Sequence, residues 1–153
     1  MRVYRLSKSK FSSDLSGKGA ELAGGRWNSK GKAVLYTSQS RALCTAEIAV
    51  HTPLGNIPTD YELVEIIIPE NIEVQEIEVS DLSQDWKAIP HSHAAQLLGD
   101  KFLAENRFLV LKVPSAVVQG DFNYLINTLH RRFYEVEISL TEPFDFDARL
   151  FSR

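Results

Sequence analysis

The sequence predicts a single compact α+β domain, and two observations support this fold class. Hydrophobic residues make up 44% of the 153-residue chain, which suits one domain with a buried core. Apolar runs rich in β-branched residues are interspersed with two stretches of helical periodicity, and no repeat, low-complexity tract or convincing linker separates them. We therefore expect residues 1–153 to fold as one unit.

Extended segments are expected wherever β-branched and aromatic residues cluster between turn residues. In 134–140 the apolar side chains alternate with polar ones, so Tyr134, Val136, Ile138 and Leu140 should share one face. The expected extended segments are 3–6, 33–37, 61–68, 72–79, 108–113 and 134–140.

Two helices are expected, together with one long loop. The first helix covers about 39–51, with Ser38 or Ser40 as its cap. The second covers 92–105, although Gly99 in its middle weakens the helical pattern. Residues 7–32 are rich in Ser, Gly and Lys and are predicted to be a loop, and loops of that length are often functional.

Composition narrows the classes of function. The net charge is −3 and the pI is about 5.8, which argues against binding driven by nucleic-acid phosphates. No apolar run could span a bilayer, and the first ten residues lack the apolar core of a signal peptide. Cys44 is the sole cysteine, which agrees with a reducing cytosol. We expect a cytoplasmic protein that does not associate with membranes.

Glu47 does not fit the packing pattern of its helix. Leu43, Ala46, Glu47 and Val50 recur at helical spacing, so the carboxylate falls on the apolar stripe. A charge placed there costs free energy unless it meets a partner or faces a cleft. The alternative is that Glu47 lies at the edge of the stripe and pairs with Arg41 or a lysine.

The segment GGRWNSKGKAVLY, residues 24–36, places an arginine among glycines. Gly24, Gly25 and Gly31 allow close approach of the backbone to a ligand. Arg26 supplies a planar fork of donors that suits phosphate or carboxylate. The spacing matches neither of the common glycine-rich nucleotide motifs, so a plain turn is the alternative.

Two further residues admit both a structural and a functional interpretation. Tyr36, on the predicted strand 33–37, is either a core residue or an aromatic platform for a ligand ring. Ser115 follows Pro114 at a strand end, where serine often caps a turn, and no nucleophile-elbow motif surrounds it. His91 and His93 lack the companions of a metal site, so no metal is expected.

Arg26, Tyr36 and Glu47 lie within 22 residues of one another, on the predicted loop, strand and helix. Together they suit a site that grips a pyrophosphate, stacks a flat ring and stabilises positive charge on a ribose.

The sequence resembles the RES-domain family, the toxins of bacterial toxin–antitoxin pairs, along almost its whole length. Arg26 and Glu47 match the arginine and glutamate of the family's name, and Ser115 matches its serine. Tyr36 matches the aromatic residue between them, whereas Thr128 stands where the family tends to have proline. The matching blocks are GGRWNSKGKAVLYTSQSRALCTAEIAVH (24–51), DWKAIP (85–90), LLGDKFLAEN (97–106), LVLKVPSAVVQGDFNYLIN (109–127) and FDFDARLF (144–151).

The resemblance implies a fold like that of the diphtheria-toxin type of ADP-ribosyltransferase. It implies NAD+ as the substrate, with the nicotinamide–ribose bond cleaved by water or inorganic phosphate, and no cofactor. Some members are instead ADP-ribosyltransferases that act on a protein. The implied partner is an antitoxin that covers the active-site cleft and binds DNA through a helix-turn-helix part. The toxin would thus meet DNA only through a hetero-oligomeric complex, and a toxin dimer is also allowed.

These implications assign a role to each residue. Arg26 would hold the pyrophosphate or an inorganic phosphate, and Tyr36 would pack against the nicotinamide or its ribose. Glu47 would accept hydrogen bonds from ribose hydroxyls and stabilise the cation. Ser115 would be a supporting hydrogen-bond donor near the nicotinamide ribose, and Asn28 and Lys32 are candidate substrate-binding residues from the same loop as Arg26. Rival functions are an RNA-cleaving toxin and a catalytically inactive binding module.

Overall fold

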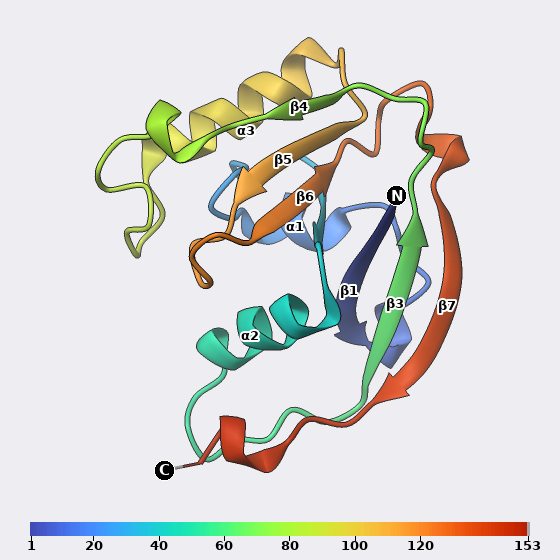
Figure 1. Ribbon diagram of the computed structural model, residues 1–153, viewed down its shortest axis with the longest axis vertical. Helices are drawn as coiled ribbons and strands as arrows, with labels where there is room; N and C mark the ends of the chain where they lie inside the picture. The colour runs from blue at the N-terminus through green and yellow to red at the C-terminus, as the bar shows by residue number, and fades with distance from the viewer. Residues whose placement is uncertain (153) are drawn as a thin grey trace.

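One seven-stranded sheet runs through the protein, whose computed structural model describes residues 1–152 (Figure 1). The strand order is β4-β5-β6-β2-β1-β3-β7, and every neighbouring pair is antiparallel except β4 and β5. The strands are β1 (Arg2–Lys8), β2 (Leu35–Ser38), β3 (Tyr61–Ile67), β4 (Val74–Glu76), β5 (Val110–Pro114), β6 (Phe122–Ile126) and β7 (Glu137–Phe144).

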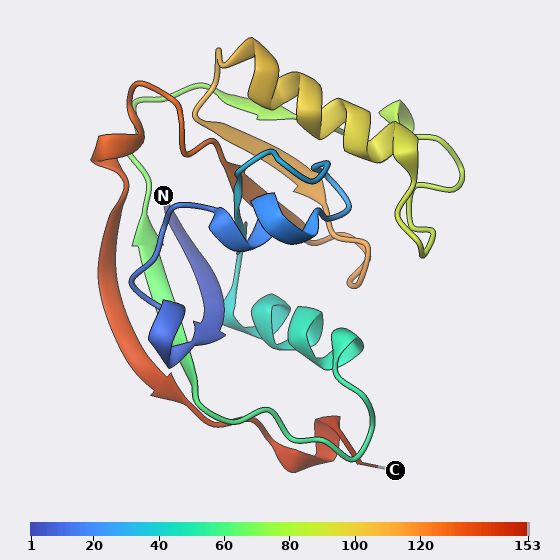
Figure 2. The same ribbon diagram turned by 180° about the vertical axis from the view of Figure 1, so that it is seen from behind.

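Three α-helices accompany the sheet: α1 (Lys18–Ala23), α2 (Arg41–His51) and α3 (His93–Glu105). Seen from behind, α1 and α3 lie on the same side of the β5–β6 part of the sheet (Figure 2). Short 3-10 turns occur at Ser9–Phe11, Val79–Asp81, Phe133–Glu135 and Ala148–Leu150. Within residues 1–152, no helix is both long and apolar enough to cross a membrane.

The sheet nearly divides between β1 and β2, which share a single residue pair, Tyr4 opposite Ser38. On one side of this division β2 pairs with β6 over four residues, and on the other β1 pairs with β3 over seven. The two halves therefore diverge from that pair, and α2 begins just after it (Figure 1). A hollow can form here without breaking the core of either half.

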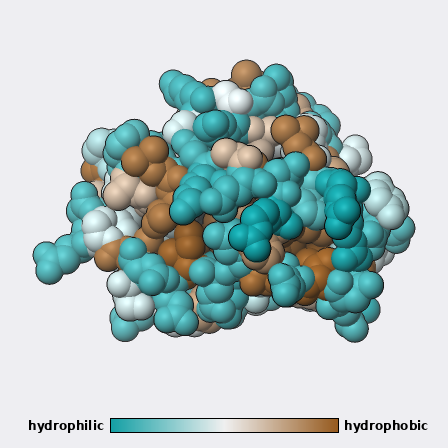
Figure 3. Space-filling view, turned by 90° about the horizontal axis from the view of Figure 1, so that it is seen from above, coloured by the Kyte–Doolittle hydropathy of each residue, from teal (hydrophilic) through white to brown (hydrophobic). Residues whose placement is uncertain are grey.

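Strand β5 organises the core because both of its faces are buried. Val110 packs with Val3, Ile66 and their neighbours, whereas Leu111 packs with Phe102 of α3 and the residues around it. Adjacent strand residues point to opposite faces, so β5 belongs to both hydrophobic clusters. The outer surface in Figure 3 is mostly hydrophilic, with its apolar patches separated by polar side chains.

The predicted α+β class is confirmed, and each expected extended segment contains a strand. The helix predicted at 39–51 begins at Arg41, and Ser40 caps it by accepting the backbone N–H of Leu43 at 3.1 Å. The helix predicted at 92–105 is also confirmed as α3.

Three expectations about local structure were wrong. The predicted loop 7–32 contains α1, a helix of six residues that is too short to show periodicity. Strand β6 was not predicted, because its apolar residues are interrupted by Asn123. The shared face of 134–140 is lost, because Tyr134 lies in a 3-10 turn and a bulge sets Leu140 opposite Glu65.

Gly99 lies in the middle of α3 because the helix packs directly on the loop that follows α1. A Cβ at Gly99 would lie 1.7 Å from the carbonyl oxygen of Trp27. Neither atom belongs to a flexible side chain, so the contact could be relieved only by moving the helix or the loop. The residue that weakened the helix prediction is required by tertiary packing.

We predict that Gly99→Ala destabilises the protein by about 1–3 kcal/mol, the usual cost of overpacking. Helix propensity alone predicts the opposite sign, a gain of about 1 kcal/mol. Urea unfolding measures the difference. The matched control is Gly19→Ala in α1, where an added Cβ meets nothing within 4 Å; that variant should be at least as stable as the parent. A Gly99→Ala protein of unchanged stability would contradict the packing argument.

Candidate active site

The loop between α1 and β2 is held by the buried side chain of Asn28. Its Nδ2 donates to the carbonyl oxygens of Ala20 at 2.8 Å and Lys32 at 3.0 Å. Its Oδ1 accepts the hydroxyl of Tyr36 at 2.6 Å. That hydroxyl also accepts the backbone N–H of Trp27 at 3.2 Å. This one amide thus ties the loop to α1 and to the hydroxyl of Tyr36.

The two helper residues expected from this loop do not reach the ligand side. Asn28 is 0% exposed, and both ends of its amide are already bonded. This corrects its expected role, because the amide shapes the loop and has no free face for a substrate. Lys32 is exposed and lies outside the lining of the cleft described below.

Helix α3 holds the same loop from the other side. Asp100 accepts the backbone N–H of Ser29 at 2.9 Å and its hydroxyl at 2.5 Å. Gln96 donates to the carbonyl oxygen of Gly25 at 2.9 Å. Trp27 is 3% exposed and packs against Trp86 with ring centroids 6.2 Å apart. The residues on both sides of Arg26 are therefore anchored.

Arg26 projects from this anchored loop toward the segment that precedes α3. Its Nη1 donates to the carbonyl oxygens of Trp86 at 2.6 Å and Ala88 at 3.2 Å. In residues 1–152, its Nε and Nη2 have no protein acceptor. Burial lowers the pKa of Arg26, and the nearby Glu47 and Tyr36 partly offset that effect. A half-buried guanidinium with free donors suits an anionic ligand.

Glu47 is held by two neutral donors on one oxygen. Its Oε1 accepts Nδ2 of Asn123 at 2.8 Å and the hydroxyl of Ser115 at 3.2 Å. The alternative of a pair with Arg41 is wrong, because Arg41 pairs with Glu142 at 2.7 Å. Among the described residues, no lysine or arginine lies within 4.0 Å of the Glu47 carboxylate. The carboxylate is therefore held by neutral groups and not by an ion pair at that distance.

Ser115 caps a turn and also contacts Glu47. Its hydroxyl oxygen accepts the backbone N–H groups of Val117 at 3.1 Å and Val118 at 3.0 Å, which closes the turn after β5. The hydroxyl proton is left to point at Glu47. Ser115 is only 2% exposed and does not itself line the cleft. It supports the glutamate from behind.

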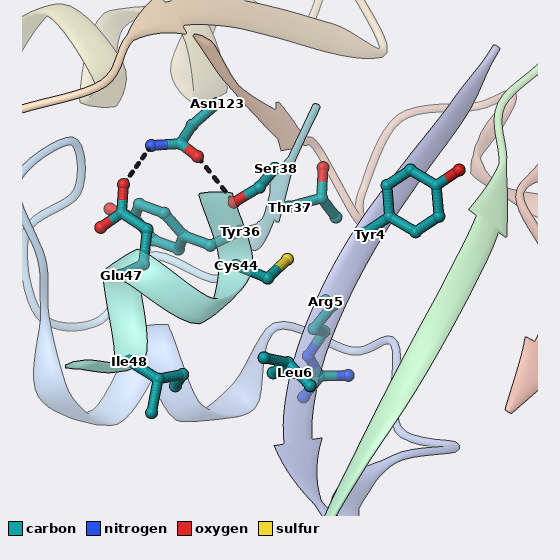
Figure 4. A pocket seen from close by; sticks show the side chains of 10 residues that line it. All are labelled: Tyr4, Arg5, Leu6, Tyr36, Thr37, Ser38, Cys44, Glu47, Ile48 and Asn123. Carbon is teal, nitrogen blue, oxygen red and sulfur yellow. Dashed lines mark hydrogen bonds between the residues drawn. The ribbon is translucent and has the colours of Figure 1, made fainter. Parts of the chain in front are cut away.

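Arg26, Tyr36 and Glu47 meet at one cleft of about 510 Å³, a volume typical of small-molecule sites. A smaller hollow of about 170 Å³, whose lining is drawn in Figure 4, adjoins it where β1 and β2 separate. Tyr36, Glu47 and Asn123 line both. The remaining residues that line the larger cleft are Gly24, Gly25, Trp27, Val50, His51, Lys87, Ile89, His91, Ala116, Val117 and Asn123.

Sequence reasoning missed the far wall of this cleft. Lys87 and Ile89 belong to a segment without periodicity, and His91 was considered only as a metal ligand. Burial lowers the pKa of His91, and the charges of Arg26 and His51 lower it further. Within residues 1–152, no group of three or more His, Cys, Asp or Glu side chains could hold a metal ion.

We predict that Tyr36→Phe changes how stability depends on alkaline pH. Burial raises the pKa of Tyr36 above its usual value near 10. Above about pH 10 the unfolded chain loses the proton of the Tyr36 hydroxyl while the folded protein keeps it. The contribution of this hydroxyl to the free energy of unfolding is therefore full below that pH and is lost as pH rises. Phenylalanine has no proton to lose. The difference in unfolding free energy between wild type and Tyr36→Phe should therefore shrink from pH 9 to 11.

Urea unfolding across that pH range measures the effect, and Tyr134→Phe is the matched control. The side chain of Tyr134 is 80% exposed. The interpretation fails if the two substitutions alter the pH dependence equally.

Comparisons with known proteins identify the family of this chain. The model of the RES domain matches residues 2–147. A protein named Toxin Res from Photorhabdus laumondii is 34% identical, covering 98% of this chain and 97% of the relative. A Prs ADP-ribosylating toxin from Sphingobium sp. is 33% identical, and the match covers 97% of this chain and 94% of that relative.

A solved structure shares the fold. The crystal structure of the M. tuberculosis MbcT–MbcA toxin–antitoxin complex contains a chain that superposes with a TM-score of 0.74 at 20% identity, covering 98% of this chain and 86% of that one. The family model spans nearly all of the sequence, and these two relatives match it over 97–98% of its length. This chain therefore belongs to the RES-domain family.

Proposed function

We propose that the protein is the toxin of a toxin–antitoxin pair and that it consumes NAD+ by cleaving the nicotinamide–ribose bond in the cytoplasm. The observation that carries this proposal is the meeting of Arg26, Tyr36 and Glu47 at one cleft. They come from a loop, a strand and a helix, and their chemistry fits three different parts of one ligand. The names of the curated relatives, Toxin Res and Prs ADP-ribosylating toxin, support it.

The reaction needs cation stabilisation more than acid catalysis. The bond between ribose and nicotinamide breaks through an oxocarbenium-like ribose, and nicotinamide leaves as a neutral molecule without a proton. Glu47 supplies a negative charge that, among residues 1–152, forms no ion pair with a lysine or arginine within 4.0 Å. Such a charge, fixed in a partly water-excluded site, favours the transition state over the ground state.

Arg26 and Tyr36 would place NAD+ against this carboxylate. The free Nε and Nη2 of Arg26 are available to the pyrophosphate, or to inorganic phosphate if that is the acceptor. The hydroxyl of Tyr36 is bonded to Asn28 and Trp27, so its ring is held in one orientation at the cleft. A fixed ring would support the nicotinamide end at little entropic cost.

A second candidate function is ADP-ribosylation of a cellular protein with NAD+ as the donor. The observation that favours it is the name of one relative, Prs ADP-ribosylating toxin. The same three residues would act, and only the acceptor of the ribose would differ. The two candidates therefore share every step up to the cation.

We also propose an antitoxin as partner, as in the complex named in the structural neighbour. Two apolar side chains at the rim of the cleft are open to solvent, Val50 at 58% and Ile89 at 78% exposure. A segment laid across them would bury apolar area and close the entrance. A helix-turn-helix part of that partner would account for any contact with DNA.

The first test removes the charge of Glu47. We predict that Glu47→Gln lowers NAD+ consumption by at least about 100-fold, the usual effect of losing a transition-state electrostatic contact. The fold should remain, because the glutamine carbonyl can still accept from Asn123. Chromatography of NAD+ and its products measures the loss, and Glu137→Gln on the exposed part of β7 is the control. Unchanged turnover in Glu47→Gln would overturn the mechanism.

The same chromatograms separate the acceptors. Free ADP-ribose indicates hydrolysis, and a phosphorylated ADP-ribose that appears only with added phosphate indicates phosphorolysis. Label from NAD+ on a protein of the cell extract supports the second candidate function.

The second test concerns the antitoxin. We predict that the complex purified after co-expression with the cognate antitoxin consumes no NAD+, whereas toxin released from it does, because the partner covers the cleft. Glu47→Gln should copurify with the antitoxin as wild type does. A complex as active as the free toxin would contradict occlusion of the cleft.

A further inference from the structure

We propose that Asn123 is a positioning residue that holds Glu47 so that Oε2 faces the reacting ribose, and that Ser38 sets the orientation of Asn123. This inference rests on the proposed function and adds two residues to it. Neither belongs to the arginine–glutamate–serine signature, and neither was expected from the sequence.

The register of the sheet brings Ser38 and Asn123 together. They are directly opposite each other in the β2–β6 pair, so their side chains share a face. Helix α2 starts three residues after Ser38 and carries Glu47 over that same face. Ser38 donates to Oδ1 of Asn123 at 2.8 Å, and Nδ2 of Asn123 donates to Glu47 at 2.8 Å (Figure 4).

The donors and acceptors of the three side chains determine the direction of each hydrogen bond from Ser38 through Asn123 to Glu47. An ionised carboxylate only accepts, so Asn123 must turn its NH₂ group toward Glu47. Its Oδ1 then faces Ser38, whose hydroxyl must donate. Ser38 is 6% exposed, so no broad contact with solvent competes for that hydroxyl. Alanine at Ser38 would remove the group that distinguishes the two ends of the amide.

Both supports of Glu47 end on the same oxygen. Asn123 and Ser115 donate to Oε1, and Oε2 accepts no hydrogen bond from residues 1–152. Two donors on one oxygen restrain the rotation of the carboxylate. Its other oxygen is left for the ribose.

The chemistry of the support is as informative as its geometry. A lysine or arginine in place of Asn123 would orient Glu47 equally well, but its charge would oppose the developing ribose cation. A neutral amide and a hydroxyl orient the carboxylate without cancelling its field. The arrangement therefore serves stabilisation of a cation better than it serves stability of the fold.

The test compares Asn123→Leu with Thr37→Val in the full-length protein. Leucine keeps the branched shape of asparagine and removes the donor. Thr37 is a matched control on the same two strands, because its hydroxyl donates to the carbonyl oxygen of Tyr124 at 2.7 Å and makes no bond to Glu47. We expect Asn123→Leu to lower kcat for NAD+ by about 10- to 100-fold, the usual effect of misplacing a catalytic group.

Further readouts separate positioning from binding and from loss of structure. KM for NAD+ should stay within about twofold of wild type in Asn123→Leu. The reason is that the Glu47 carboxylate acts mainly on the transition state and contributes little to binding of the ground state. Thr37→Val should keep its kcat. Ser38→Ala should lower kcat less than Asn123→Leu does, and the double variant should be no worse than Asn123→Leu, because Ser38 acts only through Asn123.

A crystal structure of Asn123→Leu gives a measurement that does not depend on activity. We expect the Glu47 carboxylate to leave its single orientation, while Ser115 and α2 stay in place. An unchanged Glu47 rotamer, an unchanged kcat, a defect confined to KM, or additive losses in the double variant would each overturn the inference. A wild-type protein without NAD+ turnover would instead overturn the proposed function, and the Glu47 rotamer would still decide the positioning role.

Discussion

The hydrogen bond from the hydroxyl of Tyr36 to the buried Asn28 is the contact on which the arrangement of the site depends. It joins the loop that carries Arg26 to the strand that carries the aromatic ring. Asn28 in turn donates to the carbonyl oxygens of Ala20 in α1 and of Lys32 in the loop, so one amide ties the loop to the helix before it. An unpaired buried amide is costly, and the loop is therefore stable in the single form that satisfies it.

Arg26 and Glu47 line the same cleft, but different parts of the structure hold them. Arg26 depends on α3, which holds the loop through Gln96 and Asp100. Glu47 depends on β6 and the turn after β5, through Asn123 and Ser115. The near division of the sheet between β1 and β2 leaves room for the smaller hollow beside these groups without exposing either hydrophobic cluster. Preorganisation of this kind reduces the entropy lost when a long, flexible ligand binds.

Local patterns predicted the elements that are long and regular, and failed where tertiary contacts decide. Helix α2 was predictable from its cap and its stripe, and Glu47 stood out because it interrupts that stripe. Strand β6 was missed because Asn123 faces the site in place of the core, and the missed strand concealed the residue as well. The local pattern makes Gly99 a residue that weakens a helix. Tertiary packing requires glycine at this position, because the carbonyl oxygen of Trp27 occupies the space that a side chain would need.

The sequence by itself predicted the fold class from composition and periodicity, and it indicated the family through its resemblance in several long blocks. It also singled out Arg26, Tyr36 and Glu47, three of the residues that line the cleft. Only the tertiary structure decided which polar groups face the cleft and which bond within the protein. Asn28 lies two residues from Arg26, but its amide turns inward to bond the backbone. Asn123 lies 76 residues from Glu47 and yet donates to it. The physical reason is that hydrogen bonds are short and directional, so a partner is settled by where the packed strands and helices bring atoms together.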